Sequence, residues 1–256
     1  MSHLALITAF IFGICIGSFL NVCIFRLPAG KSIVHPPSSC PGCGTAIRFY
    51  DNIPVLSWFI LRGHCRHCHT PIAFRYVLVE LLGGLMAMGV YLQFGMGVQA
   101  IVYYAFIAAL LVITFIDIDH RIIPDVISLP GILLGFAASF FIPSLSWTDS
   151  LIGLLAGGGS LYAVAWSYEL ITGKEGMGGG DIKLLAMIGA FIGWKGVLLT
   201  IFMGSALGTL VGLIAMLVEK KDMKMRIPFG PFLATGAVIS IFFGNELILW
   251  YWNFLA

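Results

Sequence analysis

Four cysteines occur as two closely spaced pairs, Cys40-Pro-Gly-Cys43 and Cys65-Arg-His-Cys68, with 21 residues between them. The two-residue gap within each pair lets both thiolates reach one centre, and two such pairs complete a tetrahedral Zn²⁺ site. Because all four ligands would come from the protein, the pattern is typical of a structural zinc rather than a catalytic one. No internal repeat longer than these pairs is evident.

Two other interpretations of the cysteines remain open from the residues alone. The pairs could form two disulfides, which persist in oxidising compartments and are rare in the cytosol. The neighbouring histidines could also replace a cysteine as metal ligands; these are His64, His67 and His69.

Two aspartates lie at the ends of apolar segments, 64 positions apart in the chain. Asp117 ends one long apolar segment, and Asp181 follows three glycines and begins another. Ionisable groups near membrane depth are costly and mark candidate functional sites. If the two carboxyl groups face each other they should share a proton. One can then act as a base on an attacking water while its protonated partner polarises a scissile carbonyl.

The residues alone leave three interpretations of these aspartates: a carboxylate dyad, a helix cap or orientation charge, and a proton relay in a transporter. An aspartate at a helix N-terminus is a common cap, which would be sufficient for Asp181. Transport sites usually lie near the bilayer midplane, whereas both aspartates border one face, which disfavours the relay. Asp119 and Asp125 compete with Asp117 for the first position, and we prefer Asp117 because it lies deepest.

Two further polar residues fall inside apolar segments. Glu80 lies one turn inside the second segment, and we expect it to form an ion pair with Arg75 or to contribute to the site. Asn21 is expected to make a hydrogen bond between two helices. The Pro228-Phe-Gly-Pro231 sequence is expected only to start the last helix.

The elements that must position these groups are transmembrane helices. Apolar residues make up 59% of the 256-residue chain and charged residues only 10%, against about 25% in an ordinary soluble domain. This composition excludes a soluble globular enzyme and a disordered chain, and the net charge of +2 gives no indication of nucleic-acid binding. Backbone polar groups in lipid must be satisfied internally and no strand-like alternation appears, so the spans are helices. We predict about eight, near residues 3–25, 76–94, 98–117, 126–144, 150–169, 181–194, 197–218 and 229–250.

The basic residues predict the orientation of these helices. Thirteen of the fourteen Lys and Arg residues fall in or beside the loops of one side, and Lys195 alone falls on the other. Basic residues are enriched on the cytosolic side, so the 49-residue loop 27–75 is predicted to be cytosolic and both termini external. A reducing cytosol disfavours disulfides, and a loop this small needs a metal to stay folded. No basic segment precedes the first helix, which is therefore expected to be retained.

Together these motifs resemble the bacterial type IV prepilin leader peptidases, which are bifunctional peptidases and N-methyltransferases of pilus and type II secretion systems. The glycine-rich string before Asp181 is similar to the signature of the GxGD intramembrane aspartyl proteases. The resemblance covers nearly the whole chain. Besides the two cysteine pairs, it rests on Gly17-Ser-Phe-Leu-Asn-Val22, Phe25-Arg-Leu-Pro28, Asn52-Ile-Pro-Val-Leu-Ser-Trp58, Arg75-Tyr76, Leu78-Val-Glu80, Ile116-Asp-Ile-Asp-His120, Pro124-Asp125, Gly173-Lys-Glu-Gly-Met-Gly-Gly-Gly-Asp-Ile-Lys183 and Ile227-Pro-Phe-Gly-Pro231.

The resemblance implies a multi-pass protein of the bacterial inner membrane in which Asp117 and Asp181 are the catalytic pair. It implies a first transmembrane helix at 1–26, a cytosolic zinc-binding domain at 27–75 and a seven-helix peptidase domain at 76–256. The substrates would be prepilins or pseudopilins, whose short basic leader is cut on the cytosolic side after a glycine. Pilus or type II secretion assembly proteins are the other expected partners, beside the lipid bilayer and without nucleic acid.

The resemblance also implies a second activity that depends on the zinc-binding loop. Members of the family methylate the new N-terminal amine with S-adenosylmethionine. In members implicated in methyl transfer, the two residues before the second cysteine pair are often Gly-Lys, and here they are Gly63-His64. Gly63 matches and is the candidate cofactor-binding residue, whereas the lysine is absent. A zinc-loop scaffold without chemistry is a further alternative, but it leaves the glycine-aspartate string unexplained.

Overall fold

The computed structural model describes residues 3–174, 176–219 and 228–255. Four of the basic residues used to predict the orientation lie outside the described residues, as do Glu175 and Ile227 of the motifs above; the four are Lys220, Lys221, Lys224 and Arg226. The chain divides into two compact units, within residues 1–112 and 113–256, and each is described here by itself. The predicted division into 1–26, 27–75 and 76–256 stays a prediction.

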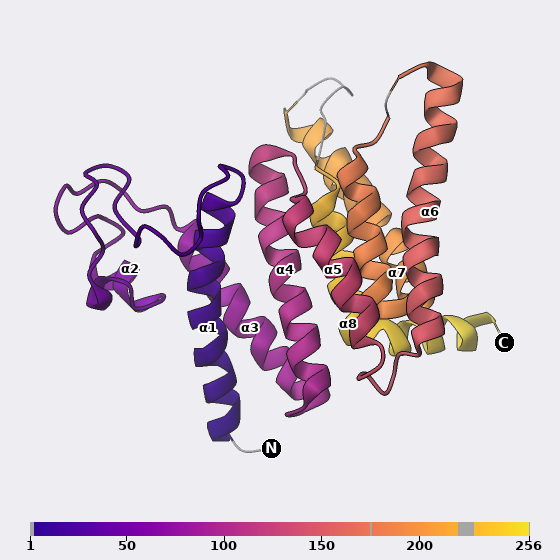
Figure 1. The fold of residues 1–256 in the computed structure, drawn as a ribbon, viewed down its shortest axis with the longest axis horizontal. Helices are drawn as coiled ribbons and strands as arrows, with labels where there is room; N and C mark the ends of the chain where they lie inside the picture. Colours follow the sequence, from indigo (N-terminus) through magenta and orange to yellow (C-terminus); the bar gives the residue numbers. More distant parts are fainter. Residues whose placement is uncertain (1–2, 175, 220–227, 256) are drawn as a thin grey trace. The chain divides into compact units, whose positions relative to one another are not determined.

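The described residues form helices and loops, without a named strand (Figure 1). Six of the helices are long and apolar enough to cross a membrane, so the predicted all-α polytopic class is confirmed. The elements, in chain order, are α1 (His3–Arg26), η1 (Phe49–Asp51), α2 (Leu56–Ile60), α3 (Arg75–Phe94), α4 (Val98–His120), α5 (Asp125–Ala138), α6 (Trp147–Thr172), α7 (Gly179–Glu219) and α8 (Gly230–Leu255).

The eight predicted segments are present, with two differences from the expected spans. Helix α7 runs through both predicted segments at 181–194 and 197–218, and it is broken at Gly193, where φ is 71° and ψ is 177°. Helix α5 ends at Ala138 rather than at 144 and has 14 residues, fewer than the roughly 20 that a full span needs. Pro143 disfavours helical geometry at the residue before it, a limit that hydropathy does not reveal.

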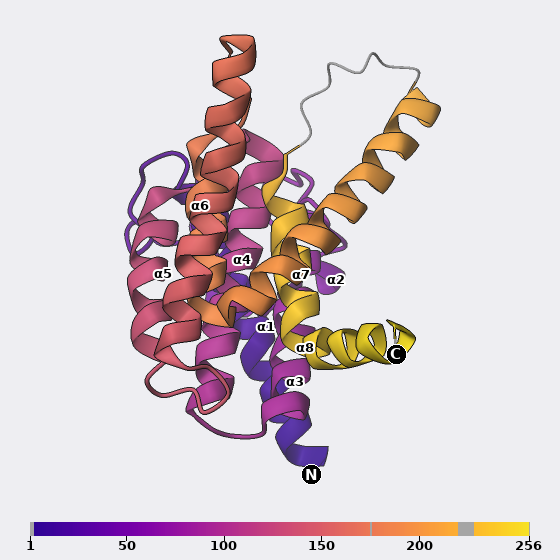
Figure 2. The ribbon, with the colours of Figure 1, turned by 90° about the vertical axis from the view of Figure 1, so that its right-hand side faces the viewer.

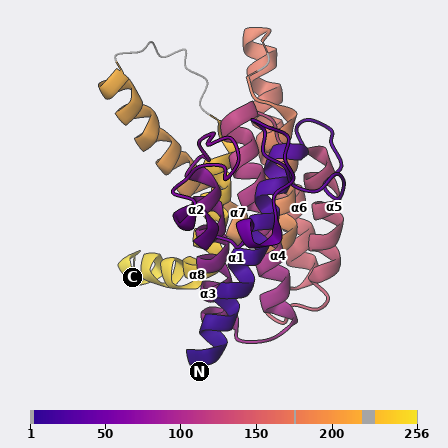
Figure 3. The same ribbon diagram turned by 90° about the vertical axis from the view of Figure 1, so that its left-hand side faces the viewer.

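In the first unit, α1 packs closely against α3 through glycines. A Cβ atom added at Gly13 would lie 2.5 Å from the carbonyl oxygen of Gly83, so the two backbones touch. Small residues of this kind allow close approach of membrane helices. The Asn21 side chain donates to the carbonyl of Tyr76 at 3.0 Å, which is the predicted hydrogen bond between helices. The loop between α1 and α3, with η1 and α2, lies beside α1 (Figures 1 and 3).

In the second unit, α7 is the central helix and packs against α5, α6 and α8. Its N-terminal half is fully buried at Leu184, Leu185 and Ile188. The contact with α6 is so close that a Cβ atom added at Gly189 would lie 2.0 Å from the carbonyl oxygen of Gly153. Figure 2 shows α7 changing direction along its length, and the C-terminal part of α8 turning aside. The buried half of α7 is the half that begins with Asp181.

Candidate active site and metal centre

Asp117 lies near the C-terminal end of α4 and is only 5% exposed. Its Oδ2 atom accepts a hydrogen bond from the backbone N–H of Gly230, the first residue of α8, at 3.0 Å. A Cβ atom added at Gly230 would lie 2.7 Å from that oxygen, so a larger residue here would displace either the carboxylate or the start of α8. The Pro-Phe-Gly-Pro sequence therefore does more than start a helix: it brings a backbone donor to a buried carboxylate. Sequence analysis missed Gly230, and its signal was a glycine at a helix start beside two prolines.

Asp181 lies in the first turn of α7 and is partly exposed. Its carboxyl group interacts electrostatically with that of Asp117, so the structure brings the two aspartates together within the second unit. The preceding Gly180 packs against Ile123, where an added Cβ atom would lie 3.0 Å from the side chain. The two groups differ in environment, because one is buried and hydrogen-bonded and the other is partly exposed.

The competing aspartates have other surroundings. Asp119 is exposed. Asp125 begins α5, and both of its carboxylate oxygens lie 2.8 Å from the Nζ atom of Lys183 in α7. The preference for Asp117 in the first position of the pair stays a prediction.

The four cysteines form one group in the first unit. Their Sγ atoms all lie within 4.8 Å of one another, and those of Cys40 and Cys68 are 3.6 Å apart. Thiolates around a tetrahedral Zn²⁺ with bonds of about 2.3 Å would be separated by about 3.8 Å, so the geometry fits such a metal. Among the described residues, the histidines beside the second pair do not belong to this group. The tetrad can therefore hold a metal through sulfur alone.

The two cysteine pairs have the same backbone structure, and the repeated unit is longer than the pair that the sequence pattern suggested. The repeated units are residues 40–45 and 65–70. In each, the backbone of the first cysteine forms hydrogen bonds with the fifth and sixth residues, and the fifth residue has a positive φ. The bonds are Cys40 N–H to Thr45 O (2.9 Å), Gly44 N–H to Cys40 O (2.8 Å), Cys65 N–H to Thr70 O (2.9 Å) and His69 N–H to Cys65 O (3.1 Å).

The threonine that ends each unit also contacts its second cysteine. The hydroxyl of Thr70 lies 3.1 Å from the Sγ atom of Cys68, and this hydrogen bond is the main reason that the pKa of Cys68 is lowered, to about 6. Thr45 likewise lowers the pKa of Cys43 through its side chain. Both contacts favour the thiolate, which is the form that binds metal.

Trp58 in α2 is the packing centre of the loop. Its Nε1 atom donates to the carbonyl of Ile72 at 3.0 Å, and its ring meets that of Phe74 edge to face. Gly63 has φ of +70°, and an added Cβ atom would lie 2.9 Å from the Trp58 ring. Glycine at 63 is therefore explained by the folding of the loop, while its role in cofactor binding stays a prediction.

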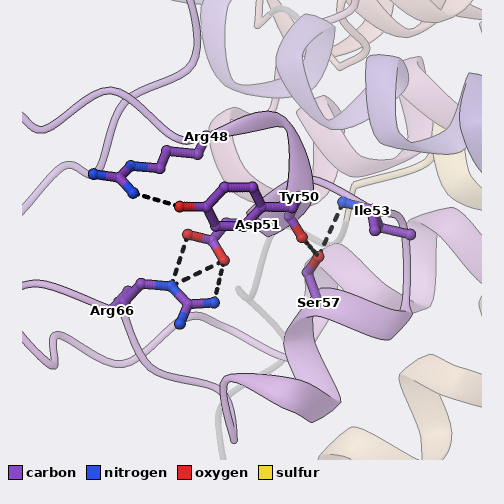
Figure 4. Close-up of polar contacts among 6 residues, drawn as sticks. All are labelled: Arg48, Tyr50, Asp51, Ile53, Ser57 and Arg66. Carbon is purple, nitrogen blue, oxygen red and sulfur yellow. Dashed lines mark hydrogen bonds and ion pairs between the residues drawn. The ribbon is translucent and has the colours of Figure 1, made fainter.

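A polar network fastens η1 to the second cysteine pair (Figure 4). Arg66, which lies between Cys65 and Cys68, donates to both carboxylate oxygens of Asp51. This hydrogen bonding lowers the pKa of Asp51. The second cysteine pair is thus held in place by this contact with η1 as well as by its own backbone turn.

Two families match separate parts of the chain. Residues 11–94 match the Bacterial Peptidase A24 N-terminal domain, and residues 104–213 match the Type IV leader peptidase family. The first match lies within the first unit, and the second begins near the end of that unit and continues through much of the second. No solved structure matches this chain.

Similar proteins carry the name "Prepilin leader peptidase/N-methyltransferase". The one from Pseudomonas putida is 38% identical, and the alignment covers 93% of this chain and 91% of the relative. That of Pseudomonas aeruginosa is also 38% identical, with coverage of 94% and 91%. That of Aeromonas hydrophila is 37% identical, with coverage of 96% and 93%. On the strength of this similarity over nearly its full length, the chain belongs to the type IV leader peptidase family.

Proposed function

We propose that this protein is a membrane-embedded aspartyl endopeptidase that removes the leader peptide of type IV prepilins or pseudopilins after a glycine. It then methylates the new N-terminal residue with S-adenosylmethionine. The observation that carries the peptidase is the electrostatic interaction between Asp117 and Asp181, in a chain of this family. The tetrad of cysteines and the names of the relatives support the second activity.

The differing environments of the two aspartates suit them to divide the work of hydrolysis. Two carboxylates that interact cannot both ionise cheaply, so the pair shares a proton. The ionised member takes a proton from water as the water attacks the peptide carbonyl, and the protonated member polarises that carbonyl. Collapse of the tetrahedral intermediate breaks the C–N bond and passes a proton to the leaving amine. The Gly230 N–H holds the buried carboxylate in place during these steps.

The glycines before Asp181 leave room for the substrate. Nothing lies within 4 Å of a Cβ atom added at Gly178 or Gly179. An extended peptide can therefore approach the backbone here without meeting side chains. We expect the leader junction of a prepilin to bind here in extended form.

The cysteine tetrad would hold Zn²⁺ as a structural ion through Cys40, Cys43, Cys65 and Cys68. When bound, the zinc keeps the loop folded, and S-adenosylmethionine supplies the methyl group. The bias of basic residues supports a site and loop on the cytosolic side of the bacterial inner membrane. Pilus or type II secretion assembly proteins are the partners that fit this place.

The peptidase is tested by incubating the purified protein in detergent with a prepilin that carries a glycine-terminated leader. Mass spectrometry should show cleavage after the glycine by the wild type and a loss of at least about 10³-fold in Asp117→Asn and Asp181→Asn, because each removes one half of the pair. Normal cleavage by either variant would remove that residue from the active site. Failure of the wild type on several precursors would remove the peptidase itself.

A further inference from the structure

Glu80 is a buried carboxylate that the peptide-cleaving pair does not use. It lies in the second turn of α3 and is 8% exposed. Helix α1 passes against it so closely that a Cβ atom added at Gly17 would lie 2.7 Å from the Cα atom of Glu80. A carboxylate at such a place is costly, so its contacts are informative.

The contacts of Glu80 lead to the metal-binding loop. Its Oε2 atom accepts a hydrogen bond from the backbone N–H of Val55 at 2.7 Å. The side chain of Ser18 in α1 is a second polar neighbour of this carboxyl group. Neither neighbour carries a charge. The Glu80 carboxylate therefore links Ser18, in the helix pair, to Val55, in the loop.

Val55 has a strained backbone conformation, which the hydrogen bond from its N–H to Glu80 stabilises. Its φ is 63° and its ψ is −54°, and the N–H of Leu56 donates to the carbonyl of Pro54 at 2.7 Å. These values describe the rare and strained form of the γ-turn. A β-branched residue at positive φ is a true outlier, which persists only when its surroundings enforce it.

The turn at Val55 sets the position of the segment that packs the loop. Helix α2 starts at the next residue and carries Trp58, on which Gly63 rests just before the second cysteine pair. Within the same segment, the Ser57 hydroxyl accepts from Ile53 N–H at 2.9 Å and donates to Tyr50 O at 3.1 Å (Figure 4). A displacement at Val55 would therefore pass to both α2 and η1.

We propose that Glu80 is a positioning residue for methyl transfer: its carboxylate fastens the metal-binding loop to α3 through the strained turn at Val55. The inference rests on the proposed function, since it assigns methyl transfer to the loop. Peptide cleavage depends on Asp117 and Asp181 in the second unit and does not need this contact. A change at Glu80 should therefore affect methyl transfer and leave peptide cleavage intact.

The test uses the full-length protein and one prepilin, for which mass spectrometry reads leader loss and the added methyl group in the same sample. Glu80→Leu leaves the Val55 N–H without its acceptor. Methyl transfer should fall roughly 10- to 100-fold, the loss that a small misplacement of a site produces, while cleavage stays within about twofold. Glu80→Gln should retain both activities, because its amide oxygen can accept from Val55 and its NH₂ can donate to Ser18.

Two further variants supply a control and test whether Glu80 acts through the turn at Val55. Asn21→Leu removes a buried hydrogen bond of the same helix pair that does not involve the loop, and it should leave the ratio of methylation to cleavage unchanged. Val55→Gly should restore methyl transfer to Glu80→Leu, because glycine adopts positive φ without being held.

Hydrogen exchange of residues 50–63 supplies a readout that does not depend on activity. Exchange should be faster in Glu80→Leu and unchanged in Glu80→Gln. The inference falls if Glu80→Leu methylates normally, if it loses cleavage and methylation in parallel, or if Glu80→Gln is equally impaired. A wild type that neither cuts nor methylates refutes the proposed function instead, while unchanged exchange in Glu80→Leu still refutes the fastening of the loop.

Discussion

The two aspartates of the candidate active site show how neighbouring residues give one residue type two different environments. Asp117 is buried and accepts a backbone hydrogen bond from the start of α8, whereas Asp181 is partly exposed in the first turn of α7. A fixed carboxylate beside an accessible one suits a reaction in which one group must stay in place while the other meets water and substrate. The backbone of Gly230 is part of this arrangement.

Gly230→Ala should therefore reduce peptide cleavage. The added methyl group would lie 2.7 Å from Oδ2 of Asp117 and must displace either the carboxylate or the start of α8. We expect at least a tenfold lower rate of leader removal, because an offset of this size at a catalytic group is costly. The measurement is the initial rate of cleavage with a detergent-solubilised prepilin.

Gly244→Ala is the matched control for this variant. It lies on the same helix, but an added Cβ atom would be 3.4 Å from its nearest neighbour, which is an ordinary contact. Its rate should equal that of the wild type. Equal rates for both variants would show that the Gly230 contact does not position Asp117.

Among the elements, the loop between α1 and α3 is the one that we expect to depend most on a ligand. Between α1 and α3 the described structure has only one short 3₁₀ helix and the five-residue α2, and its packing is centred on Trp58. A segment of fewer than about 50 residues rarely builds a sufficient core alone. The matching turns of the two cysteine pairs place four thiols around one centre, so a bound metal would be the main cross-link of the loop.

Removing the metal with a chelator should unfold this loop. Limited proteolysis should then cut within residues 27–74, and methyl transfer should disappear because its supporting loop is lost. Elemental analysis of the untreated protein should show one zinc per chain, and Cys40→Ser should reproduce the effect of the chelator.

Cys15→Ser provides the comparison, because Cys15 lies in α1 outside the tetrad. It should retain the metal and the protease resistance of the wild type. Equal resistance with and without metal would contradict the prediction and would point to the Asp51–Arg66 network as the main support of the loop.

For the whole molecule, the distribution of basic residues predicts which loops lie on each side of the membrane, which the packing of the helices does not reveal. Basic residues on one side should place the loop that contains Val34 in the cytosol, and the turn that contains Gly97 outside. An introduced cysteine at Gly97 should react with a membrane-impermeant maleimide in intact spheroplasts. One at Val34, which is 70% exposed, should react only after lysis.

The unaltered protein supplies the background for this labelling, since it has six cysteines of its own. Reaction of Val34→Cys in intact spheroplasts, with protection of Gly97→Cys, would reverse the predicted orientation. It would also place the cysteine tetrad in an oxidising compartment, where the disulfide interpretation becomes the stronger one.

The sequence by itself determined the class of the fold and the set of cysteines that can hold a metal. Apolar segments in lipid must satisfy their own backbone groups, so helices follow from composition and length. The spacing within each cysteine pair is a local property, and local spacing survives folding. The break in α7 near Gly193 was predictable for the same reason, since a glycine-rich interruption acts on its own neighbourhood.

Only the tertiary structure decided which distant residues meet. Asp117 accepts a hydrogen bond from Gly230, 113 positions away. Glu80, for which the sequence suggested Arg75 as a partner, accepts a hydrogen bond from the backbone of Val55. Several pairings of apolar helices satisfy the same hydropathy pattern. The choice among them depends on the close fit of surfaces such as Gly153 against Gly189, which is a property of shape that periodicity along one helix does not contain.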